Sequence, residues 1–175
     1  MNDIIKAMME RRSIRKFKPD MPEKEVISQV AEAGLWAANG RGMQACKTII
    51  VTDPGMRKRL VEANCRAGGF PEGTDPFYGA PVIMVVIADK DRITNVCDGS
   101  LVIGNMMLAA HSLGLGSIWI HRAKEEFEEP QFRQLLKDLG IEGEWIGVGH
   151  CAIGYADCEM PKGAPRKDGR VFWIE

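Results

Sequence analysis

The chain has 175 residues, 45% of them hydrophobic and 27% charged, which is the composition of an ordinary globular protein. This length predicts a single domain spanning residues 1–175. The formal net charge of -1 argues against a general nucleic-acid-binding protein, because such proteins are usually clearly basic.

The cysteines and the N-terminal residues indicate where in the cell the protein is expected. The five cysteines include no CxxC pair, which argues against a disulfide scaffold or a zinc ribbon and favours reduced thiols. Charged residues interrupt the N-terminal stretch, so no signal peptide is expected. The uncharged stretch between Asp98 and His121 is long enough to span a membrane, but its polar residues and glycines predict a fully buried helix and a strand. We therefore expect a cytoplasmic protein.

The first part of the chain alternates helices with one strand. Apolar residues repeat at helical spacing near the N-terminus. Pro22 and the acidic residues after it open a second helix, and Asn39-Gly40 ends it. Asp53-Pro54-Gly55 ends a short β-branched run. In chain order the pattern predicts helix 3–12, helix 22–38, strand 48–51 and helix 56–65.

A loop rich in glycine and proline follows, over residues 66–81. It is expected to expose Phe70, Phe77 and Tyr78. A long irregular loop in a compact domain is often functional or disordered. Two interpretations stay open, a lid over a site and a mobile loop.

The second part of the chain adds three strands and two helices. A continuous β-branched run predicts a central strand buried on both faces. Gly114 closes a nearly all-apolar helix, and Gly140 closes a charged amphipathic one. In chain order the pattern predicts strand 82–88, helix 99–113, strand 117–120, helix 125–139, strand 145–155 and an extended tail.

Two apolar features favour a homodimer. Residues 171–174 are apolar and would be costly to leave in water, so they are expected to add a strand to this chain's sheet or to a partner's. A helix that is apolar all round also suggests a second surface that covers it.

The residues around each candidate binding or catalytic motif do not support the function that the motif suggests. Gly147-Val-Gly149-His-Cys-Ala152 matches a dinucleotide-binding pattern, but no helix follows it, and its glycines are better explained by a crowded strand. His150 and Cys151 are strand neighbours and point to opposite faces. His111 lies in the apolar helix and is interpreted as a core histidine. No metal site and no catalytic residue are predicted.

A basic cluster follows the first helix. Arg11, Arg12 and Arg15 supply several guanidinium groups, and Ser13 adds a hydroxyl, all within about one turn. Cations at a helix C-terminus offset its negative end. Guanidinium groups also bind phosphate oxygens in pairs. From these residues alone, a solvated helix end and an anion site remain equally open.

Four segments in sequence order resemble the FMN-dependent nitroreductase family, and they are spread over nearly the whole chain. They are Met9–Phe17, Trp36–Gln44, Asp98–Trp119, and Val148–Tyr155 with Pro165-Arg166-Lys167. The second departs from the family pattern, because Gly42 stands where an asparagine is usual and Ala45-Cys46 where Pro-Trp is usual. Loss of that asparagine removes a side-chain hydrogen bond expected at the flavin ring.

The resemblance implies an α+β fold with three α/β/α layers around a central mixed, mostly antiparallel sheet. It also implies an intertwined homodimer with FMN at the subunit interface. By this resemblance the phosphate and ribityl chain are held by Arg11, Arg12, Ser13 and Arg15, with added charge from Arg166 or Lys167. The flavin of the other subunit is reached by Asn39, Gly40, Gly42 and Gln44, and the ring is approached by Trp119, Ile120 and His121.

The activity that the resemblance implies is hydride transfer from NADH or NADPH through flavin N5 to a small electron acceptor, such as a nitroaromatic, quinone or enone. Positive groups near the ring, Arg41 or His121, are candidates for stabilising reduced flavin. The alternatives are a non-catalytic flavin-binding module and a specialised relative such as a reductive dehalogenase. A nucleic-acid site at residues 11–18 is a further alternative, which the net charge disfavours.

Overall fold

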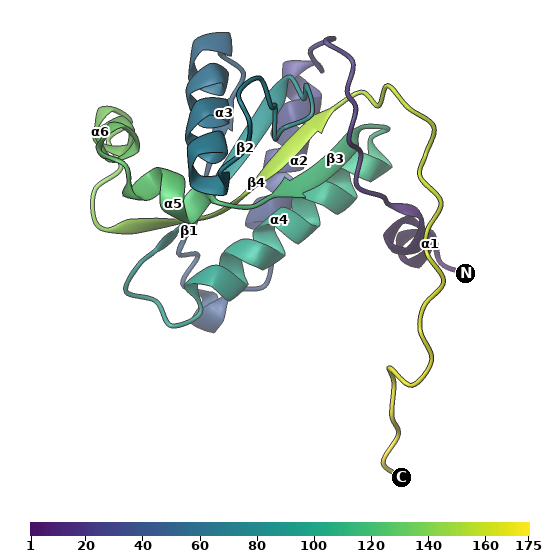
Figure 1. The fold of residues 1–175 in the computed structure, drawn as a ribbon. Helices are drawn as coiled ribbons and strands as arrows, with labels where there is room; N and C mark the ends of the chain where they lie inside the picture. The colour runs from purple at the N-terminus through teal and green to yellow at the C-terminus, as the bar shows by residue number, and fades with distance from the viewer.

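The computed structural model describes residues 1–175 and contains one four-stranded sheet with strand order β1-β2-β4-β3 (Figure 1). All three strand pairings are antiparallel. The strands are β1 (Cys46–Val51), β2 (Val82–Asp89), β3 (Gly116–Ile120) and β4 (Trp145–Gly154). The helices are α1 (Asp3–Glu10), α2 (Lys24–Leu35), η1 (Gly40–Gly42), α3 (Pro54–Gly68), α4 (Asn95–Ser112), α5 (Ala123–Glu128) and α6 (Pro130–Asp138).

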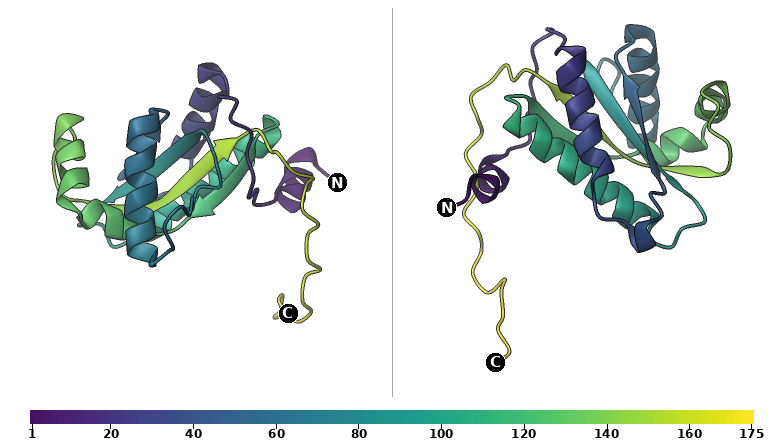
Figure 2. Two further views of the ribbon diagram at one scale, coloured as in Figure 1. Left: turned by 45° about the horizontal axis from the view of Figure 1, so that its top comes forward. Right: turned by 180° about the vertical axis from the view of Figure 1, so that it is seen from behind.

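Helices cover both faces of the sheet, which gives the expected three layers. On one face, α3, α5 and α6 bury Leu60, Phe127 and Phe132 in one apolar cluster. On the other face, α2 and α4 bury Val30 and Met106 in a second cluster (Figure 2). The central strand β2 contributes to both clusters because its side chains alternate between the two faces. The α+β class is therefore confirmed.

The sheet is more uniformly antiparallel than a mixed sheet would be. The parallel contribution is a single bridge between Ser13 and Ser117, outside the named strands. The prediction that β2 is buried on both faces is confirmed, since Val82 to Ala88 are all buried.

The glycines of β4 allow close packing, as expected. A Cβ on Gly147 would come 2.0 Å from the carbonyl oxygen of Ala123, and one on Gly149 would come 2.9 Å from the Trp119 indole nitrogen. Larger residues at these positions would push α5 or the indole away from the strand.

Three sequence predictions are wrong. Helix 125–139 is two helices, because Glu129 is extended and Pro130 starts α6 with no amide for a continuous helix. Phe77 is fully buried rather than exposed, and its ring packs edge-on against the His150 ring, with 5.1 Å between the ring centroids. His111 is only half-buried, since it lies on the side of α4 that the rest of the chain leaves partly open.

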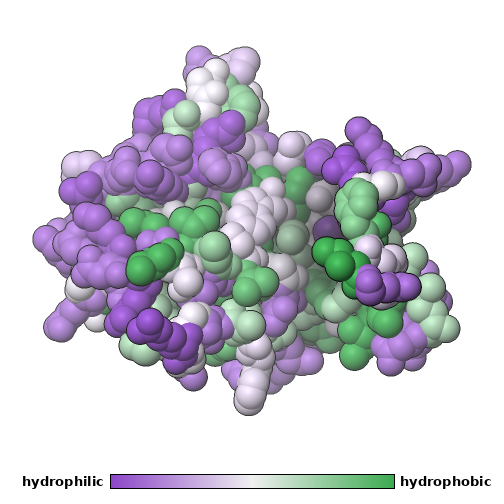
Figure 3. All heavy atoms as spheres, turned by 90° about the horizontal axis from the view of Figure 1, so that it is seen from below, coloured by the Kyte–Doolittle hydropathy of each residue, from purple (hydrophilic) through white to green (hydrophobic).

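The helix α4 is not covered all round by its own chain. Val96 and Leu101 are each about half exposed, at 52% and 49%. Seen from below, several apolar patches lie among polar residues on this side of the molecule (Figure 3). None of the helices combines the length and the apolar character that crossing a bilayer requires.

Candidate active site

The segment after α1 runs along the outer edge of β3. Ser13 forms the parallel bridge with Ser117, and the Ile14 amide donates to the Ser117 carbonyl oxygen at 3.0 Å. The Ile14 side chain is fully buried, which fixes the segment against the sheet. The basic cluster is therefore a rigid lining of the sheet edge rather than a frayed helix end.

Two arginines of this cluster carry guanidinium nitrogens without a partner. Arg12 Nη1 donates to the carbonyl oxygens of Met9 and Arg11 at 2.6 and 2.8 Å. These bonds satisfy the end of α1, as the helix-end interpretation requires. However, Arg11 Nη1 and Arg12 Nε are buried and have no hydrogen-bond acceptor. Buried charged donors without an acceptor are costly, so these atoms point to an anionic ligand.

Lys16, a later cation of the same run, forms an ion pair within the chain. Lys16 Nζ lies 2.7 Å from Asp157 Oδ2. The hydrogen bond from this lysine and its charge lower the pKa of Asp157, and the same pair raises the pKa of Lys16. Lys16 is therefore engaged, whereas Arg15 stays exposed and lines a cavity.

This cavity has a volume of about 290 Å³ and lies at the end of β3. It brings Arg15 together with the three residues that the resemblance placed near a ring, Trp119, Ile120 and His121. The loop after α3 closes one side of it. The remaining lining residues are Phe70, Thr74, Asp75, Pro76, Tyr78, Ile118 and Arg122.

Two backbone amides at the end of β3 have no acceptor within the chain, those of His121 and Arg122. The Ile120 carbonyl oxygen lies 3.1 Å from His150 Nδ1, and the His121 carbonyl oxygen accepts from Asn64 Nδ2 at 2.8 Å. Both peptides are trans, so each N–H points opposite to its carbonyl. The two amides consequently point away from the buried partners, at the end of β3 that borders the cavity.

The second group of predicted residues lies at the other edge of the sheet, where the chain enters β1. Asn39 Oδ1 accepts from the Gln44 amide at 2.9 Å, and the Gly40 amide donates to Asp98 Oδ1 at 3.1 Å. Gly42 has φ of +66°, a conformation that favours glycine. Since β1 and β3 are opposite edges of the sheet, a single chain does not bring this group to the cavity.

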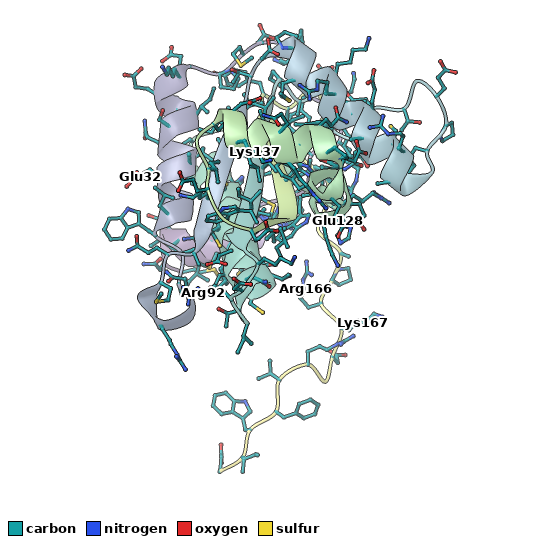
Figure 4. All side chains as sticks on the ribbon, turned by 90° about the vertical axis from the view of Figure 1, so that its left-hand side faces the viewer. Glu32, Arg92, Glu128, Lys137, Arg166 and Lys167 are labelled. Carbon is teal, nitrogen blue, oxygen red and sulfur yellow. The ribbon has the colours of Figure 1, made fainter.

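The tail residues Arg166 and Lys167 are also separate from the arginine cluster. Both lie on the extended C-terminal segment, beyond the body of the molecule (Figure 4). The tail passes α1 at Gly163, where a Cβ would come 2.0 Å from Arg12 Nη2. It then runs away from the body as an extended segment (Figure 1).

The model of the nitroreductase family matches residues 8–67 and 72–155, which is most of the chain. The chain belongs to the nitroreductase family. This confirms the resemblance on which the site was predicted.

Individual relatives agree with this membership. An NADPH-flavin oxidoreductase of Vibrio harveyi is 30% identical over 183 residues, covering 98% of this chain and 72% of its own. A putative NADH dehydrogenase/NAD(P)H nitroreductase of Methanothermobacter thermautotrophicus is 31% identical over 121 residues, covering 67% of this chain and 60% of its own. The match with this archaeal relative thus spans less than two thirds of that protein's length. A nitroreductase of Desulfitobacterium hafniense, solved with bound FMN, is 26% identical with a TM-score of 0.88, and each chain is covered completely.

Several residues around this cavity carry no sequence signal that points to a site. Arg122 has φ of +79°, and its guanidinium lies 4.7 Å from the centre of the Phe70 ring. Asn64 and Glu126 lie on helices and look like ordinary helix residues. The sequence predicted only that His150 and Cys151 point to opposite faces of the sheet, and not which helices cover His150.

Proposed function

We propose that the chain is an FMN-dependent oxidoreductase that passes electrons from NADH or NADPH to a small acceptor, such as a nitroaromatic, quinone or enone. One observation carries the proposal. The buried guanidinium nitrogens lie just before the segment that pairs with β3, and the free backbone amides lie at the end of β3, where Arg15 of the same basic cluster lines a cavity. Donors grouped in this way suit a ligand with a phosphate at one end and a polar ring edge at the other.

The residues present fit FMN in chemical type. Arg11 Nη1 and Arg12 Nε would bind phosphate oxygens, and Ser13 with Arg15 would hold the adjoining ribityl chain. The amides of His121 and Arg122 would donate to the ring edge, beside Trp119 and Ile120. The dinucleotide-like glycine motif of β4 takes no part, because those glycines serve packing.

The protein's own contribution is binding, orientation and exclusion of water. FMN, when bound, supplies the chemistry of accepting hydride from a nicotinamide and delivering electrons to an acceptor. With the ring bound in the cavity, the free amides and Arg122 would supply positive electrostatic potential beside the negative charge that develops on it. Phe70 shields one side of the cavity through its contact with Arg122. No side chain is required as a nucleophile.

A homodimer would complete this site. Asn39, Gly40, Gly42 and Gln44 lie at the β1 edge of one chain, and the cavity lies at the β3 edge. Two chains packed through the exposed apolar side of α4 would let the β1-edge group of one serve the cavity of the other. The tail, with Arg166 and Lys167, would reach across in the same assembly. We propose this with a single domain per chain and a cytoplasmic location, which five free thiols support.

The proposed role of the basic cluster, the arginine socket for the FMN phosphate and ribityl chain, is tested with Arg12→Ala and Arg15→Ala. We expect FMN to dissociate at least tenfold more readily from each variant, because a charge-assisted hydrogen bond contributes about 1.5–3 kcal/mol. Arg133→Ala, at an exposed position on α6, is the matched control and should leave binding unchanged. FMN affinity is measured by fluorescence quenching on titration. Unchanged affinity in both socket variants would refute the assignment.

Steady-state oxidation of NADH or NADPH with menadione or a nitrofuran then separates catalysis from binding alone. Yellow protein that turns over neither acceptor would favour the non-catalytic flavin-binding module. Release of halide from a halogenated aromatic substrate by the same yellow protein would favour the dehalogenase alternative. Colourless protein that binds DNA or RNA in a salt-sensitive manner would favour the nucleic-acid alternative.

A further inference from the structure

Three polar side chains form a fully buried cluster beneath the end of β3: Asn64 of α3, Glu126 of α5 and His150 of β4. Asn64 Nδ2 donates to Glu126 Oε1 at 2.6 Å, and Glu126 Oε2 lies 2.8 Å from His150 Nε2. The same Asn64 Nδ2 donates to the His121 carbonyl, and His150 Nδ1 lies 3.1 Å from the Ile120 carbonyl oxygen. Buried polar groups are costly unless they are hydrogen-bonded, and these bonds satisfy the polar atoms of the cluster except Asn64 Oδ1, which has no partner within the chain.

The acceptors around His150 fix its hydrogens. The Ile120 carbonyl oxygen only accepts, so His150 Nδ1 must carry a hydrogen. His150 Nε2 faces a carboxylate oxygen, so one further proton lies between this nitrogen and Glu126 Oε2. The pair is then neutral as a unit, which suits its complete burial.

The cluster determines where two peptide planes point. Two donors, His150 Nδ1 and Asn64 Nδ2, hold the carbonyls of Ile120 and His121 toward the core. Because the peptides are trans, the amides of His121 and Arg122 are turned outward by the same bonds. A donor bound at the carbonyl also polarises its peptide group and strengthens the opposite amide as a donor.

We propose that Asn64, Glu126 and His150 are positioning residues that aim the His121 and Arg122 amides into the cavity at the open edge of β3. Where FMN binds as proposed above, these amides support the ring more strongly when it is reduced and electron-rich than when it is oxidised. The second part rests on the proposed function, whereas the orientation of the amides does not.

The orientation is tested first on the full chain without added FMN. In Asn64→Leu the His121 carbonyl loses its donor at little cost in volume. We expect the backbone NMR order parameters of His121 and Arg122 to fall from about 0.85 to below about 0.6. Asn105→Leu is the matched control, because Asn105 also donates from Nδ2 to a backbone carbonyl, that of Ala33 on the far side of the sheet at 3.1 Å. The control should leave both order parameters unchanged.

The effect on the cofactor is tested by comparing the affinities for reduced and oxidised FMN. We expect Asn64→Leu to lower the ratio of these affinities about tenfold, equal to about 30 mV for a two-electron couple. Glu126→Gln should hold the ratio within about twofold, because its carbonyl can accept from Asn64 and its amide can donate to His150 Nε2. A folded Glu126→Gln variant whose affinity ratio falls as far as that of Asn64→Leu would overturn the proposal.

Two further outcomes decide the matter. If Asn64→Leu and Asn105→Leu behave alike in order parameters and in affinity ratio, the cluster is merely structural and the proposal is overturned. If Asn64→Leu does not fold, the wild-type protein still decides, through the exchange-protected Nδ1 hydrogen of His150 expected in nitrogen-15 NMR spectra, and its absence overturns the proposal. A wild-type chain that binds no FMN refutes the proposed function alone, because the order parameters still report the orientation.

Discussion

Single residues in this protein differ in reactivity because they differ in burial. The Cys151 thiol is fully buried on β4, and desolvation raises its pKa to about 12, opposed by the nearby charge of Arg11. Burial also raises the pKa of the half-buried Cys46 to about 11, with a further contribution from Asp98. Cys158, by contrast, lies exposed after β4. Since the thiolate is the reactive form, these cysteines should be modified in a fixed order.

We therefore predict that iodoacetamide at pH 8 modifies Cys158 quickly and Cys151 only after unfolding. A pKa of about 12 leaves a thiolate fraction on the order of one in ten thousand at this pH, and burial also blocks the reagent. Peptide mass spectrometry over time gives both rates. Cys158→Ser should remove the fast modification of that peptide and leave Cys97 as the remaining exposed thiol. Equal rates for Cys158 and Cys151 in native protein would contradict the prediction.

At the scale of elements, the loop between α3 and β2 is anchored rather than free. Arg57 Nη2 lies 2.5 Å from Asp75 Oδ2, and Arg57 Nε donates to the Ala80 carbonyl at 2.8 Å. Asp75 also accepts from the amides of Phe77 and Gly79. These bonds favour an ordered wall of the cavity over the mobile loop that the glycines and prolines also allowed.

We predict that Arg57→Ala lowers the free energy of unfolding by about 1.5–3 kcal/mol, because it removes hydrogen bonds to a charged partner in a partly buried setting. Limited proteolysis should also cut within residues 69–79 sooner than in the wild type. Arg92→Ala breaks an exposed arginine–aspartate pair of 3.3 Å and should cost less than about 1 kcal/mol. Urea unfolding of both variants measures the difference, and equal costs would show that the loop has no special anchor.

At the scale of the whole molecule, the C-terminal tail exposes large apolar side chains that no other part of the same chain covers. Phe172 and Trp173 are 83% and 84% exposed, on a segment that leaves the body of the chain (Figure 1). Large exposed apolar patches usually mark interaction sites. The partly open side of α4 offers a second such patch, with Leu101 at 49% exposure.

We predict that Phe172→Ser combined with Trp173→Ser weakens self-association at least tenfold, because burying each aromatic side chain contributes about 1.5–3 kcal/mol. Sedimentation equilibrium gives the dissociation constants. Lys162→Ser combined with Asp168→Ser alters the same tail without changing its apolar area and should leave association intact. A double aromatic variant that associates as tightly as the wild type would place the interface elsewhere.

The sequence by itself determined the order of helices and strands, the buried central strand β2, the packing role of the β4 glycines and the family. Each of these rests on periodicity, on breaking residues or on motifs, which act over a few neighbouring positions. The helix break at Pro130 was readable in the same way, but the charged amphipathic pattern on both sides of it masked the break.

Only the tertiary structure decided which residues meet. Asn64 and Glu126 are 62 positions apart and Glu126 and His150 are 24 apart, yet the packing of α3 and α5 against β4 joins them beneath the cavity. The same topology places the Asn39–Gln44 segment and the arginine cluster at opposite edges of one sheet. The proposed orientation of the His121 and Arg122 amides rests on those contacts, because a donor at each carbonyl turns the opposite N–H away from it.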